Sequence, residues 1–144
     1  MTGPSLKHQH SHEAIHEAAL GEARELTDIL AKCLQEGEQD KAYQVADIVI
    51  EHWETRTLKH AEAEEEGLYQ DVLTEKPDMI GTITELSHDH DLMRRIVQNI
   101  KERMQSRVDE QIYLWMEALI IIDKLHNEDE MAKLLAPMER RQIS

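Results

Sequence analysis

Histidine and glutamate recur in this sequence at spacings that suit a shared metal site. His60 precedes Glu64 by four residues, and His126 precedes Glu130 by the same interval. Residues four apart lie on one side of an α-helix, so each pair offers an imidazole nitrogen and a carboxylate to a common point. A carboxylate can also bridge two ions. The two HxxxE pairs therefore predict metal binding, provided that both lie on helices.

The segments that precede these pairs also resemble each other. Residues 10–15 read HSHEAI and residues 88–93 read HDHDLM, and each segment comes before one HxxxE pair. The repeat therefore adds one lone histidine to each half, His12 and His90. The order along the chain is His, HxxxE, His, HxxxE, which predicts six donor groups built from two similar halves.

The composition favours the helices that this chemistry requires. Of 144 residues, 40% are hydrophobic and 32% charged, with five Gly, three Pro and no Phe. Such a composition predicts an all-α protein, and the length fits one domain over residues 1–144 with a single core. Breakers at Gly37, at 77–81 and at 105–106 divide the chain into predicted helices 5–36, 39–75, 82–105 and 107–135. Short connections favour antiparallel neighbours, so we expect a single up-down-up-down four-helix bundle.

Each predicted helix carries an apolar stripe, and the donor groups lie in line with these stripes. The third stripe is the most regular: Ile83, Leu86, His90, Met93, Val97, Ile100 and Met104. The fourth contains Ile112, Trp115, Leu119, Ile122, His126 and Glu130. The first contains His12, Ile15, Ala19, Ala23, Leu26, Leu30 and Cys33, and the second Val45, Val49, Trp53, Thr57, His60, Glu64 and Leu68. We therefore expect the polar members of all four stripes to face the core.

The rise of the helices places these groups near one level. At 1.5 Å per residue, His12 lies about 37 Å and His60 about 31 Å from the first connection. Four histidines and two carboxylates suit two non-haem iron ions with open coordination positions, whereas structural zinc, the second choice, prefers closed sites rich in cysteine. A single HxxxE pair is usually a solvated ion pair. Two pairs on apolar stripes favour metal, because unpaired buried charges would cost several kcal/mol each.

The chain also resembles a known family, the haemerythrin-like (HHE cation-binding) domain. Residues 60–69 (HAEAEEEGLY) are similar to its HxxxEExxLF segment, residues 86–90 (LSHDH) to its LxxxH, and residues 126–130 with Leu134, Leu135 and Pro137 to its second copy. Met131 stands where a second glutamate is usual. The resemblance implies a di-iron centre in which Glu64 and Glu130 bridge two irons. It implies the ligands His12, His60, Glu64, His90, His126 and Glu130.

The same resemblance implies several functions. The first is binding of dioxygen by a carrier, store or sensor, and the partner is then dioxygen or another small diatomic molecule or peroxide. The alternative is a di-iron enzyme acting on peroxide or nitric oxide, or an iron donor in iron–sulfur cluster repair. A third is a structural or signalling module. No nucleophile or general-base constellation outside the metal residues indicates a different reaction, so we expect no catalytic residue of that kind.

The remaining histidines and aromatic residues leave some assignments open. His16 follows His12 by one turn and could ligate, but its repeat partner is Arg94, which favours a solvent-facing or supporting role. His52 is a weaker candidate for a ligand or pocket residue. His8, His10 and His88 are expected to be solvated, and a tyrosine ligand from among Tyr43, Tyr69 and Tyr113 is a remote alternative. The acidic cluster of Glu62, Glu65 and Glu66 is expected to be a solvated face, with a path for iron as the alternative. The side chains expected to pack around the metal level are Trp53, Met93, Trp115, Leu119 and Ile122.

Charge and hydropathy exclude several partners. The net charge of −14 disfavours DNA and RNA, since it repels phosphate. The longest strongly apolar run, residues 118–122, is too short for a membrane helix, so no membrane partner is expected. The single Cys33 cannot form an internal disulfide and no signal peptide is recognisable, which predicts a cytoplasmic protein.

Overall fold

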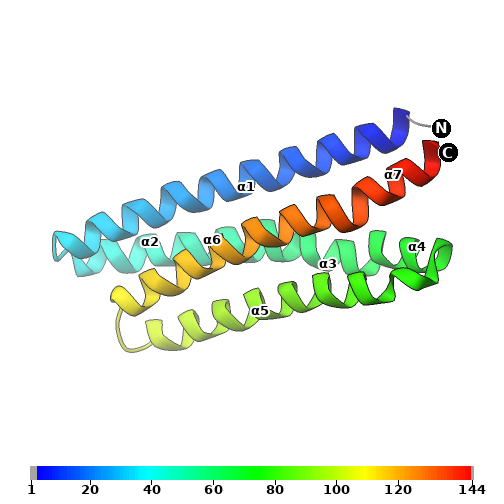
Figure 1. Ribbon diagram of the computed structural model, residues 1–144. Coiled ribbons are helices and arrows are strands. Elements are labelled where there is room, and N and C mark those ends of the chain that lie inside the picture. Colours follow the sequence, from blue (N-terminus) through cyan, green and yellow to red (C-terminus); the bar gives the residue numbers. More distant parts are fainter. Residues whose placement is uncertain (1–2, 144) are drawn as a thin grey trace.

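The computed structural model describes residues 3–143, with side chains described for residues 11–139, and this part of the chain is helical without strands. The prediction of an all-α fold is therefore confirmed. Four helical arms follow one another along the chain (Figure 1). The first arm is α1 (Gly3–Gln35), and the third is α5 (Ile80–Met104), which follows a short 3₁₀ turn, η2 (Pro77–Met79).

The second and fourth arms are interrupted helices. The second comprises α2 (Gln39–His52), a π-helical turn η1 (Trp53–Thr57), α3 (Leu58–Glu66) and α4 (Leu68–Glu75). The fourth comprises α6 (Glu110–Glu130), a π-helical turn η3 (Met131–Leu135) and α7 (Ala136–Ile143). The predicted end at residue 135 was wrong: the helix continues, because the amide-free Pro137 lies in the first turn of α7 directly after the wider π turn.

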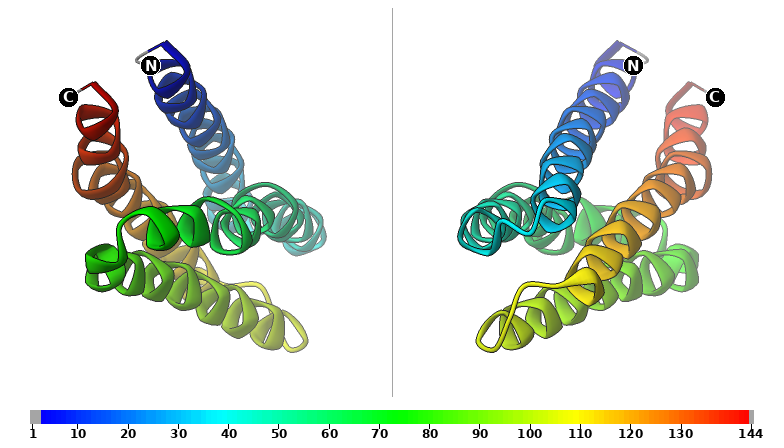
Figure 2. Two further views of the ribbon diagram at one scale, coloured as in Figure 1. Left: turned by 90° about the vertical axis from the view of Figure 1, so that its right-hand side faces the viewer. Right: turned by 90° about the vertical axis from the view of Figure 1, so that its left-hand side faces the viewer.

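The arms surround one another in a bundle. α1 packs against α2 and α6, and α5 packs against α6 and α3. Both chain ends lie at one end of the bundle, where α1 and α7 are neighbours, and the connection from α1 to α2 lies at the other end (Figures 1 and 2). The middle of each arm therefore faces the middle of its neighbours.

Two glycines shape the first and second arms. Gly37 has φ of +69°, a left-handed conformation that glycine adopts without steric cost, and it lets Glu38 N donate to Cys33 O at 3.0 Å. Gly67 separates α3 from α4 while its N–H still donates to Ala63 O at 2.9 Å. A Cβ at residue 67 would lie 3.1 Å from that oxygen, so the bend at this point favours glycine.

The apolar core is divided in two by a polar layer. The larger cluster lies towards the α1–α2 connection and includes Leu30, Trp53, Val97 and Leu119. The smaller cluster lies towards the chain ends and contains Tyr69, Val72, Ile83, Leu86 and Leu134. Along every arm, the predicted donor residues fall beside or between these clusters. The polar layer is thus enclosed by protein above and below.

The buried faces agree with the predicted stripes in α5 and differ elsewhere. In α5 every predicted position from Ile83 to Ile100 is buried, and only Met104 is half-buried. In α6 the stripe was partly wrong: the buried positions are Ile112, Met116, Leu119, Ile120, Asp123, His126 and Glu130. Trp115 and Ile122 are half-buried. In α1 the side chain of Ile15 is 51% exposed, and the next residue, His16, faces the bundle instead.

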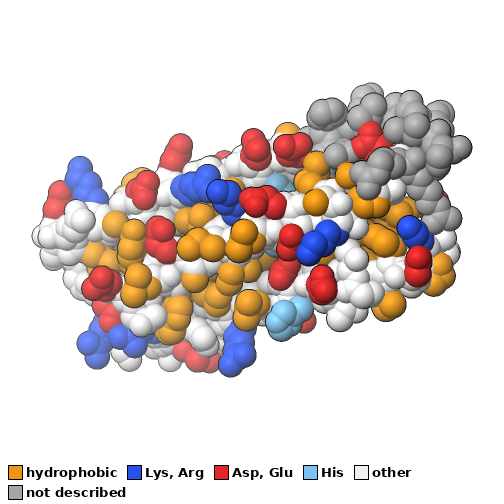
Figure 3. Space-filling view, viewed as in Figure 1, with side chains coloured by type: hydrophobic (Ala, Val, Ile, Leu, Met, Phe, Trp, Pro, Cys, Tyr) orange, Lys and Arg blue, Asp and Glu red, His pale blue; other side chains and the backbone are white. Residues whose placement is uncertain are grey.

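The surface mixes apolar and charged side chains. Ile121 and Leu125 on α6 are more than half exposed. On the face that Figure 3 shows, acidic and basic side chains are interspersed with apolar ones. Within the part of the chain that the structure describes, no helix combines the length and apolarity that a bilayer crossing requires.

The start of α6 generates a stability prediction. Asp109 has extended backbone angles, and its Oδ1 accepts from Ile112 N at 3.4 Å, while Oδ2 lies 2.6 Å from an Arg103 nitrogen. We expect Asp109→Ala to lower the free energy of unfolding by about 1 kcal/mol, because the helix loses its cap. Asp109→Asn, which keeps the acceptor, should lose less in urea unfolding followed by circular dichroism. Equal losses in both variants would assign the effect to the Arg103 ion pair instead.

Candidate metal centre

The polar layer gathers carboxylates and imidazoles that are almost fully enclosed. Glu64 of α3 is 4% exposed, Glu130 of α6 is 0%, and His90 and His126 are 2% each. Ionised groups in such surroundings require opposite charges or hydrogen bonds, because burial removes most of the water that would otherwise stabilise them. The geometry of these four side chains therefore decides what the layer can hold.

Glu64, His90, His126 and Glu130 form an inner group. Each offers one ligand atom, and these atoms all lie within 4.8 Å of one another. The Nε2 atoms of His90 and His126 are 3.1 Å apart. His90 Nε2 lies 3.5 Å from Glu64 Oε1, and His126 Nε2 lies 3.5 Å from Glu130 Oε2. The four atoms converge as ligands around one cation would.

His12, His16 and His60, together with Glu64, form a second, outer group of ligand atoms within the same 4.8 Å limit. His12 Nε2 lies 2.6 Å from Glu64 Oε2, and His60 Nε2 lies 3.6 Å from the same oxygen. The three histidine side chains are 11–26% exposed. The outer group thus borders the inner one on the more accessible side.

Both carboxylates face the two groups at once. Glu64 presents Oε1 to His90 and Oε2 to His12. Glu130 accepts a hydrogen bond from His12 at Oε1, 2.5 Å away, and presents Oε2 to His126. One oxygen of each carboxylate therefore faces each histidine group.

The structure brings together the six residues that the sequence singled out and adds His16, whose Nε2 lies 4.0 Å from Glu130 Oε1. The sequence favoured a solvent-facing or supporting role for His16, whereas the structure places its ring among the donor residues. His52 lies elsewhere: its Nε2 donates to Ala19 O at 2.8 Å and so ties α2 to α1. His88 is exposed, as expected, and the side chains of His8 and His10 lie outside the described residues.

The donor set fits a metal ion. Buried polar atoms normally have a hydrogen-bond partner, yet His60 Nε2 and Glu64 Oε2 have none with hydrogen-bond geometry among the described residues. His12 Nε2 is close to Glu64 Oε2 but off the hydrogen-bond direction. The donors are imidazole nitrogens and carboxylate oxygens, and Cys33 packs in the larger apolar cluster. Nitrogen and oxygen donors of this kind suit a borderline or hard transition-metal cation, whereas soft cations prefer thiolate donors.

The surroundings in the polar layer shift the pKa values of His12 and His16 in opposite directions. Burial lowers the pKa of His12, but its hydrogen bond to Glu130 and the negative charges of Glu130 and Glu64 outweigh this effect and raise the pKa to about 10. Burial lowers the pKa of His16 to about 3, helped by the charge of His12. Burial disfavours the charged form of Glu130, yet hydrogen bonds from His12 and His126 lower its pKa. The carboxylate is held ionised and His16 neutral, which are the forms that bind metals.

Two further carboxylates orient the inner histidines. Glu65 Oε2 accepts from His90 Nδ1 at 2.9 Å, and Asp89 Oδ2 accepts from His126 Nδ1 at 2.9 Å. Arg94 donates to both oxygens of Glu65, at 3.1 and 2.7 Å, and fixes that carboxylate. Burial would raise the pKa of Glu65, but the bonds from Arg94 and His90 lower it, so it stays ionised. With Nδ1 occupied, each ring turns Nε2 towards the inner group.

Tyr69 makes a further contact, which the sequence did not single out. Its hydroxyl donates to Glu130 Oε2 at 2.5 Å, and its ring is parallel to the ring of His90 with centroids 5.8 Å apart. Burial and the charges of Glu130 and Glu64 raise the pKa of Tyr69 far above its ordinary value, so it remains a phenol that donates. The kink at Gly67, two residues earlier, places the ring beside the layer. No periodicity in the sequence could have shown this contact.

A comparison with family models identifies the architecture: residues 10–136 match the Hemerythrin HHE cation binding domain. The chain belongs to this family. The match covers both HxxxE pairs and both lone histidines, so the predicted resemblance is confirmed. The protein is therefore a hemerythrin-like cation-binding domain whose His and Glu cluster is compatible with metal binding. Searches of curated proteins and of solved structures give no significant match.

The orienting carboxylates generate a prediction for this hemerythrin-like domain. Asp89→Asn and Glu65→Gln should each weaken metal affinity about 10-fold to 100-fold, because His126 or His90 loses the partner that fixes its ring. Competition with a chelator, followed by metal analysis, measures the affinity. Glu85→Gln, an exposed acid on α5, is the matched control and should leave it unchanged. Wild-type affinity in both variants would contradict an orienting role.

Proposed function

We propose that this domain holds two non-haem iron ions and binds dioxygen at the resulting di-iron centre, as a carrier, store or sensor. The observation that carries the proposal is the shared position of Glu64 and Glu130, each with one oxygen towards each histidine group. His12, His60, Glu64, His90, His126 and Glu130 would hold the irons. His16 would be a seventh ligand, on the outer iron.

Iron is favoured over zinc by the donor set. Four or five imidazoles with two shared carboxylates leave coordination positions free on two ions, as oxygen-binding non-haem iron requires, and no thiolate is present in either group. When bound, the two irons supply the two electrons that capture of dioxygen needs. The histidines would hold the ions within reach of both Glu64 and Glu130.

The surrounding protein restricts water at the centre. Apolar clusters close the polar layer on two sides, and the fully buried Met93 lies beside the donors. A dry shell strengthens electrostatic interactions and slows loss of a bound anion.

We interpret the arms as an up-down-up-down bundle forming one domain over residues 1–144, which the positions of the chain ends and connections support (Figure 1). The single, buried Cys33 agrees with a cytoplasmic location.

A second candidate function is turnover of peroxide at the same centre. One observation favours it, a carboxyl group, Asp123, that lines the cavity beside the donors. Nitric oxide reduction and donation of iron to damaged iron–sulfur clusters have no comparable feature in the described residues.

Iron loading tests the proposal. We expect two irons per chain, because the two groups supply too many donors for one ion, and a new near-ultraviolet or visible absorption band when the anaerobically reduced protein meets oxygen. Metal analysis and absorbance spectroscopy measure these results. One tightly held zinc, or two irons without any oxygen-dependent band, would contradict the proposal.

Single substitutions test how the ligands are shared. His16→Ala should lose about one iron per chain, since His16 belongs only to the outer group. Glu64→Ala and Glu130→Ala should impair both irons, because each faces both groups. His88→Ala, an exposed histidine on α5, is the matched control. Two retained irons with an unchanged ferric spectrum in His16→Ala would leave six ligands and assign His16 a supporting role.

A further inference from the structure

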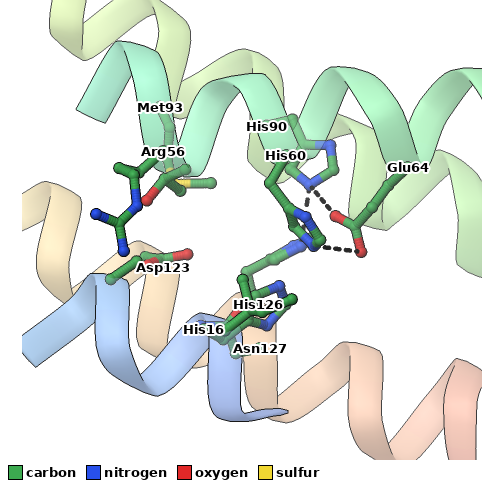
Figure 4. Close-up of a pocket in the computed structure, with 12 residues that line it drawn as sticks. His16, Arg56, His60, Glu64, His90, Met93, Asp123, His126 and Asn127 are labelled. Atoms are coloured by element: carbon green, nitrogen blue, oxygen red, sulfur yellow. Dashed lines mark hydrogen bonds and ion pairs between the residues drawn. The ribbon is translucent and has the colours of Figure 1, made fainter. Parts of the chain in front are cut away.

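A small cavity adjoins the polar layer. Its volume is about 40 Å³, which is room for roughly three water-sized groups. His60, His90 and Glu64 lie on one side of it, and Asp123, Met93 and Arg56 on the other (Figure 4). A small ligand in this cavity would touch the proposed irons on one side and Asp123 on the other.

Asp123 is a buried acid without a partner. It lies on the regular buried face of α6, one turn before His126, and is 3% exposed. Among the described residues it makes no hydrogen bond and no ion pair within 4.0 Å, whereas the other acids near the layer, Asp89 and Glu65, are paired. Arg56 lines the same cavity, but its ion pair is with Glu22: Arg56 Nη1 lies 3.3 Å from Glu22 Oε2. A buried carboxyl with no protein partner indicates a partner that comes from outside.

The chemistry of a carboxyl group limits what that partner can be. Burial raises the pKa of Asp123 to about 6, so at about pH 8 the group is ionised in most molecules. An ionised carboxylate only accepts hydrogen bonds. Dioxygen or an aprotic anion such as azide offers it nothing, and the anion is repelled. A ligand with an O–H group donates to it and removes the unpaired acceptor.

We propose that Asp123 makes the cavity selective for small O–H ligands of the hydrogen peroxide class. A carboxylate oxygen of Asp123 accepts the hydrogen bond of the ligand and takes its proton, so hydrogen peroxide becomes a hydroperoxide anion facing the metal side while Asp123 becomes neutral. This inference rests on the proposed di-iron centre and favours peroxide chemistry at it. Asp123 then acts on the ligand itself and is not a metal ligand.

The test compares protic and aprotic ligands at about pH 8. Iron-loaded wild type, Asp123→Leu and Asp123→Asn are titrated with hydrogen peroxide by stopped-flow absorbance and with azide by ordinary absorbance. Asp123→Leu should raise the apparent Kd for peroxide about 10-fold or more, the usual effect of losing a hydrogen bond to a charged group. Its Kd for azide should fall or stay unchanged. Asp123→Asn keeps one acceptor but takes no proton, and should lie between.

Two controls isolate the role of Asp123. Glu128→Gln removes one exposed acid from the same helix and should change neither Kd. The metal-free Asp123→Leu protein should melt at a higher temperature than wild type, because it no longer buries an unpaired carboxylate. A lower melting temperature in both Asp123 variants would show a structural partner and overturn the proposal.

Three other outcomes would also overturn it. They are no peroxide response in wild type carrying two irons, equal weakening of peroxide and azide, and no change of either Kd in the variants. Failure of the wild type to hold two irons refutes the proposed function and this inference together. Two irons with any one of these three outcomes refute this inference alone.

Discussion

Two buried carboxylates, Glu64 and Glu130, are the constraint on which the rest of this structure depends. Ionised groups are costly inside a bundle unless several partners surround them, and here each partner comes from a different arm. His12 approaches from α1, His90 from α5 and His126 from α6. The polar layer therefore ties the arms to one another and sets their relative heights. In the absence of cations, the histidines balance the negative charges of Glu64 and Glu130. If cations are bound, the histidines and the cations would balance these charges together.

The departures from regular α-helix are concentrated around this layer. The turn η1 ends three residues before His60, Gly67 follows Glu64 by three residues, and η3 begins directly after Glu130. A π turn adds a residue and rotates the next part of the helix, so each interruption changes the direction of nearby side chains. The kink at Gly67 is followed by Tyr69, which donates to Glu130. The helix interruptions thus lie next to the residues where the donors converge.

The two histidine groups are built differently, and the difference has chemical consequences. The inner histidines are enclosed and each is oriented by a carboxylate, Glu65 or Asp89. The outer histidines are partly exposed. An orienting carboxylate makes an imidazole a stronger donor, so the inner histidines are the stronger donors and the outer histidines the more accessible ones. The cavity with Asp123 adds a further carboxyl group beside this site.

The sequence by itself determined the helical class, the buried face of α5 and the convergence of six donor residues, because 3.6-residue periodicity and helix rise are local properties. It did not determine that His16 rather than Ile15 faces the bundle, since adjacent positions differ by only a fraction of a turn. It missed Asp123, although the spacing from Ile112 through Met116, Leu119 and Asp123 to His126 is regular, because a polar residue interrupts an apolar pattern. Glu65, Asp89 and Tyr69 could be assigned only from the tertiary structure. Their roles depend on how neighbouring arms cross and on the irregular turns that rotate them, and neither is encoded in the pattern of a single helix.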